Sequence, residues 1–308
     1  MVAYLGIDKG GTRHTFALAD ERGDVFRRLQ HETDRHAGAE AELASLRVDV
    51  ASLIKEASAL NSPIEGIGIS FGGPVDVISG RTLLSHHVAG WEGVPLRELF
   101  EGWFGLPTAI DNDANAGALG EWKFGAGVGC RNMLYVNVGT GIGGGIIANG
   151  QLLRGERNLA GEIGHMTLDP SGPLCTCGRR GCLESFASGP AIERRFAERR
   201  GGRKAQPLTS RKIFEMARGG DANAGAIVVE TADYLARGIG AGVSLLSPER
   251  IILGGGVSEA GEILLGPLNE LLPKYILPQA VGIRVVSAQL GYDAGVRGAI
   301  ALAMGNYQ

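Results

Sequence analysis

The chain opens with a pattern of apolar strand-like runs around a glycine turn, and this pattern recurs further along. Residues 2–7 form a short apolar run, a glycine turn follows, and residues 15–19 form a second run. Residues 133–138 and 146–148 repeat the arrangement on either side of a longer glycine turn. Each copy predicts a strand, a glycine-rich turn and a return strand. The repeat therefore indicates two related halves.

Helical periodicity and further strands follow each copy of this pattern. Apolar residues spaced three and four apart between Leu43 and Leu60 predict an amphipathic helix. The remaining elements alternate as they do in α/β proteins. The predicted strands are 64–70, 108–111, 251–253 and 283–286, and the predicted helices are 96–104, 114–124, 191–200, 210–217, 222–246 and 294–304.

The pattern predicts an α/β protein of two α/β domains with a cleft between them. Its 308 residues are enough for two domains with cores of their own. We expect residues 1–115 and the last helix, 292–308, to form the smaller domain. Residues 116–291 are expected to form the larger one.

Composition narrows the classes of function. The net charge of −3 leaves no basic footprint, so nucleic acid is not an expected partner. No apolar run reaches the ~18 residues of a transmembrane helix, and the first residues lack the basic region of a signal peptide. We therefore expect no membrane association and a cytoplasmic location. The 50 glycines come in bursts, which indicates tight turns or close approach to a ligand.

Three of the four cysteines lie in one short segment as C-x-C-x4-C, with a histidine upstream. Three thiolates and one imidazole are a common closed ligand set for structural zinc. A disulfide is disfavoured because three cysteines leave one unpaired and no secretory signal precedes them. Chance clustering in a loop is the alternative. The candidate zinc ligands are His165, Cys175, Cys177 and Cys182, with Glu162 and Glu184 at the rims.

The two glycine turns, at residues 8–12 and 139–145, are candidate phosphate loops because converging backbone N–H groups bind phosphate. A GxxxxGK[ST] motif is absent, and strands rather than a helix follow the glycines, which excludes a P-loop and a Rossmann fingerprint. Ordinary hairpin turns are the alternative. Asp8 could orient Mg²⁺ through its water shell, while Thr12 and Thr140 each add a hydroxyl donor.

A polar cluster, Asp111-Asn112-Asp113, ends one predicted strand, and ligands bind at the carboxyl ends of strands in α/β sheets. Asp113 has two interpretations. It could accept a hydroxyl proton during phosphoryl transfer, or it could cap the following helix. Asn112 is expected to hydrogen-bond substrate hydroxyls, and such a mixture of donors and acceptors suits a sugar.

Together these segments resemble the ROK family of sugar kinases and sugar-sensing repressors. The resemblance covers nearly the whole chain and implies the hexokinase/actin-like ATPase fold, with ATP bound between the domains. The matching motifs are DxGGT at 8–12, IGISFGGPVD at 67–76, NDANA at 112–116, VGTGIGGG at 138–145, ExGHx9CxCGxxGCxE at 162–184 and ILGGGVS at 252–258.

The resemblance also implies roles for single residues. Asp113 would be the general base, and His165 would bind zinc with one ring nitrogen and a sugar hydroxyl with the other. Mg²⁺ is expected to accompany ATP, and Zn²⁺ to be structural. The implied sugar contacts are Gly73, Asn112, Asp113, Glu162, His165 and Glu184. The implied phosphate and nucleotide positions are Asp8, Gly10, Gly11, Thr12, Gly139, Thr140, Gly141, Gly255 and Gly256.

Two departures from the family pattern concern the sugar. His86 and His87 stand before Val88–Trp91, where many hexose-specific relatives have Asn-Leu-Pro-Gly-Trp. Phe71–Pro74 also departs from the commoner Pro-Gly order. Glucose phosphorylated at O6 is the first expectation, and N-acetylmannosamine or another hexose is the alternative. We interpret the two histidines as loop residues.

A sugar-responsive transcription regulator is the second class of function. Repressors of the family add an N-terminal helix-turn-helix, whereas the first strand here starts at Val2. The enzyme interpretation is therefore favoured: a glucokinase-like phosphotransferase that takes a sugar and ATP. Polyphosphate stays open as an alternative phosphoryl donor, and a homodimer or homotetramer is expected.

Overall fold

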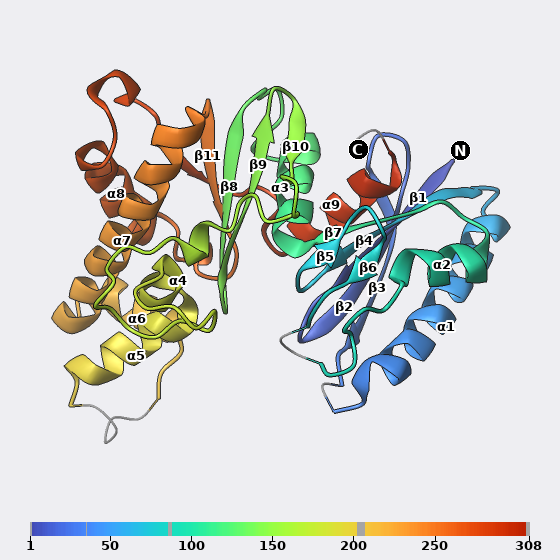
Figure 1. Ribbon diagram of the computed structural model, residues 1–308, viewed down its shortest axis with the longest axis horizontal. Helices are drawn as coiled ribbons and strands as arrows, with labels where there is room; N and C mark the ends of the chain where they lie inside the picture. The colour runs from blue at the N-terminus through green and yellow to red at the C-terminus, as the bar shows by residue number, and fades with distance from the viewer. Residues whose placement is uncertain (1, 35, 86–87, 202–206, 306–308) are drawn as a thin grey trace. The chain divides into compact units, whose positions relative to one another are not determined.

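The computed structural model describes residues 2–34, 36–85, 88–201 and 207–305. Contacts divide the chain into two units (Figure 1). The first comprises Met1–Val128, Arg154–Ala160 and Asp293–Gln308, and the second comprises Gly129–Leu153 and Gly161–Tyr292. The first unit thus includes the helix after residue 112, which the sequence analysis assigned to the larger domain. The predicted cleft between the halves stays a prediction.

Each unit contains a five-stranded sheet, and the two sheets have the same pattern of directions. In the first, β3-β2-β1 are antiparallel neighbours, and β4 and β7 continue the sheet parallel to β1. In the second, β10-β9-β8 are antiparallel, and β11 and β12 continue parallel to β8. Strands on either side of each glycine turn therefore pair as hairpins, which confirms the predicted repeat.

The elements of the described chain are as follows. The strands are β1 (Ala3–Lys9), β2 (Arg13–Ala19), β3 (Val25–Glu32), β4 (Ile64–Phe71), β5 (Val75–Asp76), β6 (Arg81–Thr82), β7 (Thr108–Asn112), β8 (Met133–Val138), β9 (Ile142–Ala148), β10 (Gln151–Leu153), β11 (Arg250–Gly254) and β12 (Val285–Ser287). The α-helices are α1 (Gly38–Ala59), α2 (Leu96–Phe104), α3 (Asp113–Phe124), α4 (Leu183–Ala187), α5 (Gly189–Arg199), α6 (Ser210–Arg218), α7 (Ala222–Leu246), α8 (Glu262–Leu271) and α9 (Ala294–Ala303).

Every predicted strand and helix is present, with ends shifted by a few residues, but several elements were missed. Strand β3 lies at a sheet edge and is exposed along most of its length, so it lacks the alternation that marks a half-buried strand. Helix α8 contains Pro267, which weakens a helical pattern. Among the described helices, none has the length and apolar character needed to cross a membrane.

In the first unit, α1 and α2 cover one face of the sheet, and α9 with α3 covers the other (Figure 1). Glycine allows α9 to approach closely. A Cβ atom on Gly68 of β4 would lie 1.8 Å from the Ala299 carbonyl, and one on Gly298 would lie 1.7 Å from the Ala116 carbonyl. At these contacts the main chains of α9, β4 and α3 meet directly, without side chains between them. The last helix therefore packs in the first unit, as predicted.

Candidate functional site

The parallel register of the first sheet brings three predicted polar segments to one edge. Ser70 of β4 pairs with Asp8 of β1 on one side and with Asp111 of β7 on the other. The first glycine turn, Gly73 and Asp113 directly follow these three strand ends. This is the edge at which α/β sheets bind ligands.

Asn112 caps helix α3. Its Oδ1 atom accepts a hydrogen bond of 2.7 Å from the Asn115 backbone N–H. The interpretation of Asp113 as the cap is therefore wrong: Asp113 is the first residue of the helix, and it is exposed. An exposed carboxylate in the first turn of a helix also lies where the helix dipole favours negative charge.

Asp111 is buried and orders this strand end. Its Oδ2 atom accepts a hydrogen bond of 2.7 Å from Arg154 Nε. Its Oδ1 atom accepts two hydrogen bonds, of 2.8 Å from Asn115 Nδ2 and of 2.9 Å from the Asn112 N–H. Asp111 is 1% exposed and Arg154 15%. Sequence reasoning missed Arg154 because it belongs to a distant segment, residues 154–160, that returns to the first unit.

The carboxylate of Asp8 lies beneath the first glycine turn. Ser70 Oγ donates to it at 2.7 Å, and a Cβ atom on Gly295 of α9 would lie 2.7 Å from it. Burial raises the pKa of Asp8, although the hydrogen bond from Ser70 opposes the shift. A cation near this carboxylate would offset the cost of its burial, so Asp8 fits the predicted magnesium role.

The first turn itself consists of Gly10, Gly11 and Thr12. The Gly10 N–H donates to the Arg13 carbonyl at 3.1 Å, which closes the hairpin of β1 and β2, and Thr12 is exposed. Gly73 lies against Leu84, because a Cβ atom on Gly73 would be 2.4 Å from the Leu84 carbonyl. His86 and His87 lie outside the described residues.

The second unit gathers its predicted nucleotide positions in the same way. The Gly139 N–H donates to the Gly141 carbonyl at 2.9 Å, and Thr140 between them is exposed. Strands β8 and β11 are parallel neighbours, so Gly255 and Gly256 follow β11 beside this turn. Gly255 has a φ of +84°, and a Cβ atom on it would lie 2.4 Å from the Val138 carbonyl, so the position requires glycine.

The three clustered cysteines and His165 converge on one point. Their ligand atoms all lie within 4.8 Å of one another. The Sγ atoms of Cys177 and Cys182 are 3.6 Å apart, and Cys175 Sγ is 3.6 Å from His165 Nδ1. The edge of a tetrahedron with zinc–sulfur bonds of about 2.3 Å is about 3.8 Å. The donor set and its spacing therefore fit a zinc ion.

The thiols of this cluster differ in acidity. Hydrogen bonding to the Arg179 backbone lowers the pKa of Cys177 to about 6, whereas burial raises the pKa of Cys182 to about 12. Burial also raises the pKa of Cys175. A bound metal would displace the protons that remain on the thiols.

Two carboxylates flank this cluster. Glu162 Oε2 lies 3.9 Å from His165 Nε2, so the two ring nitrogens of His165 face a carboxylate and the thiols. Glu184 Oε2 accepts from the Ile142 N–H at 2.9 Å, and its Oε1 accepts from Thr176 Oγ1 at 2.9 Å. Glu184 therefore connects the cysteine segment to the second glycine hairpin, a link that the sequence did not reveal.

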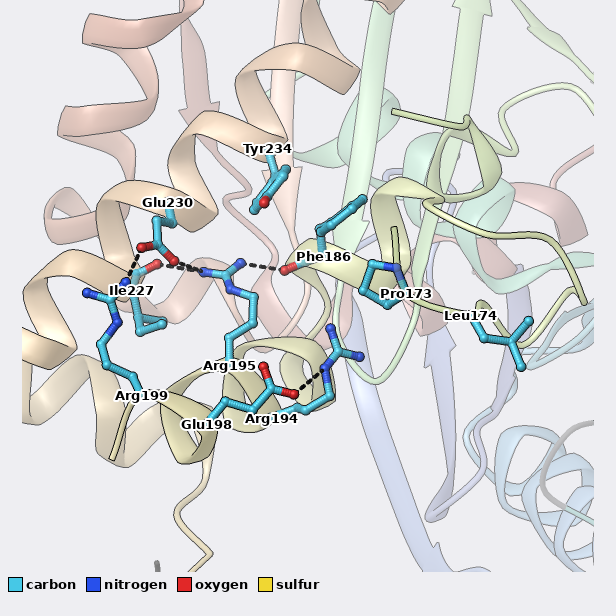
Figure 2. A pocket seen from close by; sticks show the side chains of 10 residues that line it. All are labelled: Pro173, Leu174, Phe186, Arg194, Arg195, Glu198, Arg199, Ile227, Glu230 and Tyr234. Atoms are coloured by element: carbon cyan, nitrogen blue, oxygen red, sulfur yellow. Dashed lines mark hydrogen bonds and ion pairs between the residues drawn. The ribbon is translucent and has the colours of Figure 1, made fainter. Parts of the chain in front are cut away.

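Each unit also contains a cavity. One of about 790 Å³ in the second unit is lined by three arginines of α5 that are already paired with protein groups (Figure 2). Arg195 donates to the carbonyls of Phe186 and Ile227, and Arg199 pairs with Glu230. The other cavity, of about 470 Å³ in the first unit, includes Arg154 in its lining. Among the described residues that line the two cavities, none is predicted to bind sugar, nucleotide or metal.

Comparison with known proteins identifies relatives over the whole chain. The model of the ROK family matches residues 4–306. A glucokinase of Thermotoga maritima is 36% identical over 97% of this chain and 96% of its own length. An N-acetylmannosamine kinase of Yersinia pestis is 36% identical over 96% of both chains. The crystal structure of a ROK family glucokinase from Streptomyces griseus, in complex with glucose and AMPPNP, gives a TM-score of 0.82 at 32% identity and covers 98% of this chain and 99% of that one.

The buried ion pair behind the α3 terminus gives a stability prediction. Arg154→Met leaves the Asp111 carboxylate buried without its cation, and we expect unfolding free energy to fall by about 3–5 kcal/mol. Denaturant unfolding measures this. Arg27→Met is the matched control, since Arg27 pairs with Glu56 at the surface and its loss should cost less than about 1 kcal/mol. Equal losses in the two variants would contradict the role given to Arg154.

Proposed function

The chain belongs to the ROK family and is a sugar kinase, and we propose that it transfers a phosphoryl group from ATP to O6 of glucose, with Asp113 as the general base. The observation that carries the proposal is the division of roles at the end of β7. Asp111 is buried and paired, Asn112 caps α3, and Asp113 is exposed at the strand end where substrates bind in α/β sheets. Phosphoryl transfer to an alcohol requires a carboxylate that accepts the hydroxyl proton.

The first unit supplies the proton acceptor and the metal-binding carboxylate in this proposal. The Oδ1 atom of Asn112 accepts the capping hydrogen bond of α3, so its amide Nδ2 is the group that donates to a sugar hydroxyl. Gly10 closes the turn through its N–H bond to the Arg13 carbonyl, and the N–H groups of Gly11 and Thr12 bind phosphate oxygens. Mg²⁺, when bound with ATP, neutralises charge on the transferred phosphoryl group, and Asp8 would hold the ion through its waters.

The second unit supplies a phosphate turn and further sugar contacts. Gly139 shapes this turn through its N–H bond to the Gly141 carbonyl. The N–H groups of Thr140 and Gly141 and the Thr140 hydroxyl bind phosphate, and Gly255 and Gly256 leave room for the adenosine. Glu162 and His165 lie on one short 3-10 turn, and each presents a polar atom that can bind a sugar hydroxyl. Glu184 joins them as a third contact, since a carboxylate with two accepted hydrogen bonds has lone pairs left. Zn²⁺ in the Cys175, Cys177, Cys182 and His165 site is structural.

Glucose and N-acetylmannosamine are the two sugars that the relatives bring forward. The Streptomyces griseus structure contains glucose, which supports a glucose site on this fold. The Thermotoga and Yersinia enzymes have the same sequence identity to this chain, 36%, so identity does not choose between the two sugars. The preference for glucose rests on the three hydrogen-bond acceptors expected around the sugar ring. An unmodified aldohexose offers a hydroxyl to each acceptor, whereas a 2-acetamido group replaces one of these hydroxyls. The homodimer or homotetramer and the cytoplasmic location stay predictions.

The base assignment predicts a loss of activity without a loss of stability. Asp113→Asn should lower kcat by about 10²–10⁴-fold, because general base catalysis contributes that much, while sugar binding is retained. Its unfolding free energy should change by less than about 0.5 kcal/mol, as expected of an exposed residue. Steady-state kinetics and denaturant unfolding measure the two effects.

Asn112→Ala is the matched variant for the cap of α3. It removes the cap and should lower unfolding free energy by about 1 kcal/mol. Near-normal kcat in Asp113→Asn would remove Asp113 from the base role.

The cysteine cluster predicts about one zinc ion per chain. Cys177→Ser should lose the metal and, because the cluster holds His165 and Glu184 in place, should also lose stability and sugar affinity. Metal analysis and calorimetric titration with glucose check both effects. Cys130→Ser is the control, since Cys130 lies outside the cluster and should keep the metal. Active protein without zinc would contradict the assignment.

The substrate assignment predicts the highest kcat/KM for glucose. A site built to hydrogen-bond a hydroxyl rejects a sugar that lacks it by as much as ~10⁴-fold, so the ranking should be steep. A coupled assay that compares glucose, mannose and N-acetylmannosamine with ATP measures it. If N-acetylmannosamine gives the higher kcat/KM, the glucose assignment is wrong and the kinase assignment stands.

A further inference from the structure

A buried ion pair lies directly behind the first glycine turn. Lys9, the last residue of β1, places its Nζ 3.0 Å from Glu42 Oε2 of α1, and the two side chains are 2% and 4% exposed. The same Glu42 oxygen accepts 2.7 Å from Trp91 Nε1. One carboxylate of α1 therefore contacts both the strand that enters the glycine turn and the loop that carries Trp91.

Aromatic rings and a histidine complete the surroundings of this pair. Lys9 Nζ lies 5.3 Å from the ring centroid of Phe71 and 4.7 Å from that of Trp91, within the range of a cation–π contact. His14 Nε2 lies 3.3 Å from Glu42 Oε1, without the alignment of a hydrogen bond. Burial lowers the pKa of Lys9, and the charge of Glu42 opposes that shift.

Stability alone does not account for such a pair. Two charges lose their hydration on burial, and replacement of a buried ion pair by apolar residues of similar volume is often neutral or stabilising. Lys9 stands in a strand whose other inward positions, including Leu5 and Ile7, are apolar and fully buried. An apolar residue at position 9 would pack among Phe71 and Trp91 without this cost. The pair therefore calls for a role other than stabilisation.

The geometry links the pair to the phosphate turn. Side chains alternate along a strand, so Lys9 points toward α1 while Asp8 points to the opposite face, where α9 lies against its carboxylate. The Lys9 carbonyl accepts a hydrogen bond of 3.0 Å from the Gly72 N–H, and this main-chain bond to the segment before Gly73 does not involve the Lys9 side chain. A restraint on the Lys9 side chain therefore acts on the same backbone from which Asp8 and the following N–H groups project.

We propose that Lys9 and Glu42 are positioning residues for phosphoryl transfer: their ion pair holds the end of β1 so that Asp8 and the Gly10–Thr12 turn meet ATP in the reactive geometry. The inference rests on the proposed role of that turn as a phosphate loop. It assigns to the pair an effect on ATP and on kcat, and none on the sugar. A displacement of reacting groups by about 1 Å can cost about 10²-fold in rate, so a loosened turn should be visible in kcat.

The test compares Lys9→Met, Glu42→Gln and the double variant. Methionine keeps the volume and an apolar surface for the two rings, and glutamine keeps an acceptor for the Trp91 indole. Each single variant leaves one buried charge unpaired, so both should lose thermal stability and activity. The double variant should regain wild-type thermal stability, because no unpaired charge remains. It should nevertheless keep a kcat at least about tenfold below wild type, with a raised KM for ATP and an unchanged KM for the sugar.

A matched double variant controls for the loss of any ion pair. Arg27 of β3 pairs with Glu56 of α1 at 2.7 Å on the surface of the same unit. Arg27→Met with Glu56→Gln should leave Tm, kcat and both KM values at their wild-type levels.

Several outcomes would overturn the inference. Wild-type kcat in the stable double variant would show that the pair is only structural, as would recovery of kcat in parallel with Tm. A rise in the KM for the sugar equal to the fall in kcat would place the effect on the sugar side. If the double variant does not fold, Lys9→Gln with Glu42→Gln, which keeps polar contacts, is measured in the same way. A wild-type chain that phosphorylates no sugar would instead refute the proposed function.

Discussion

The glycines of a turn have no side chains with which to hold its shape, so the geometry of the turn depends on contacts from outside. In each unit a carboxylate from a helix supplies such a contact. Glu42 of α1 holds Lys9 at the entrance of the first turn, and Glu184 of α4 accepts the Ile142 N–H at the exit of the second. A carboxylate suits this purpose because its two oxygens accept several hydrogen bonds at once. The conformational freedom of the glycines is thus restrained at each hairpin.

At the end of β7, differences in burial give adjacent polar residues different roles. Asp111 is enclosed and satisfied by Arg154 and Asn115, so it serves as a fixed support. Asn112 gives its oxygen to the helix terminus, and Asp113 remains exposed. Two carboxylates separated by one residue therefore differ in environment, and environment rather than residue type sets what each can do.

The cysteine segment has a mechanical connection beyond its ligands. Through Glu184 it bonds to the second glycine hairpin, and through His165 it reaches Glu162. A metal that fixes the thiols would therefore also restrain the second glycine turn. The arginines of α5 line the cavity of the second unit and stabilise the fold there (Figure 2). Arg195 donates to main-chain carbonyls at the end of α4 and in α7, so its charge is paired with protein groups.

The sequence by itself determined the repeated hairpins, most of the strands and helices, the clustering of three cysteines with a histidine, and the family, because turn chemistry, periodicity and residue spacing are local properties. It left open which residue caps α3, gave no partner for Lys9 or Arg154, and missed the edge strand β3. Only the tertiary structure decided these points. A buried charge can pair with any of many carboxylates along the chain, and the choice depends on which helix packs over which strand end. That packing brings together residues that no local pattern relates.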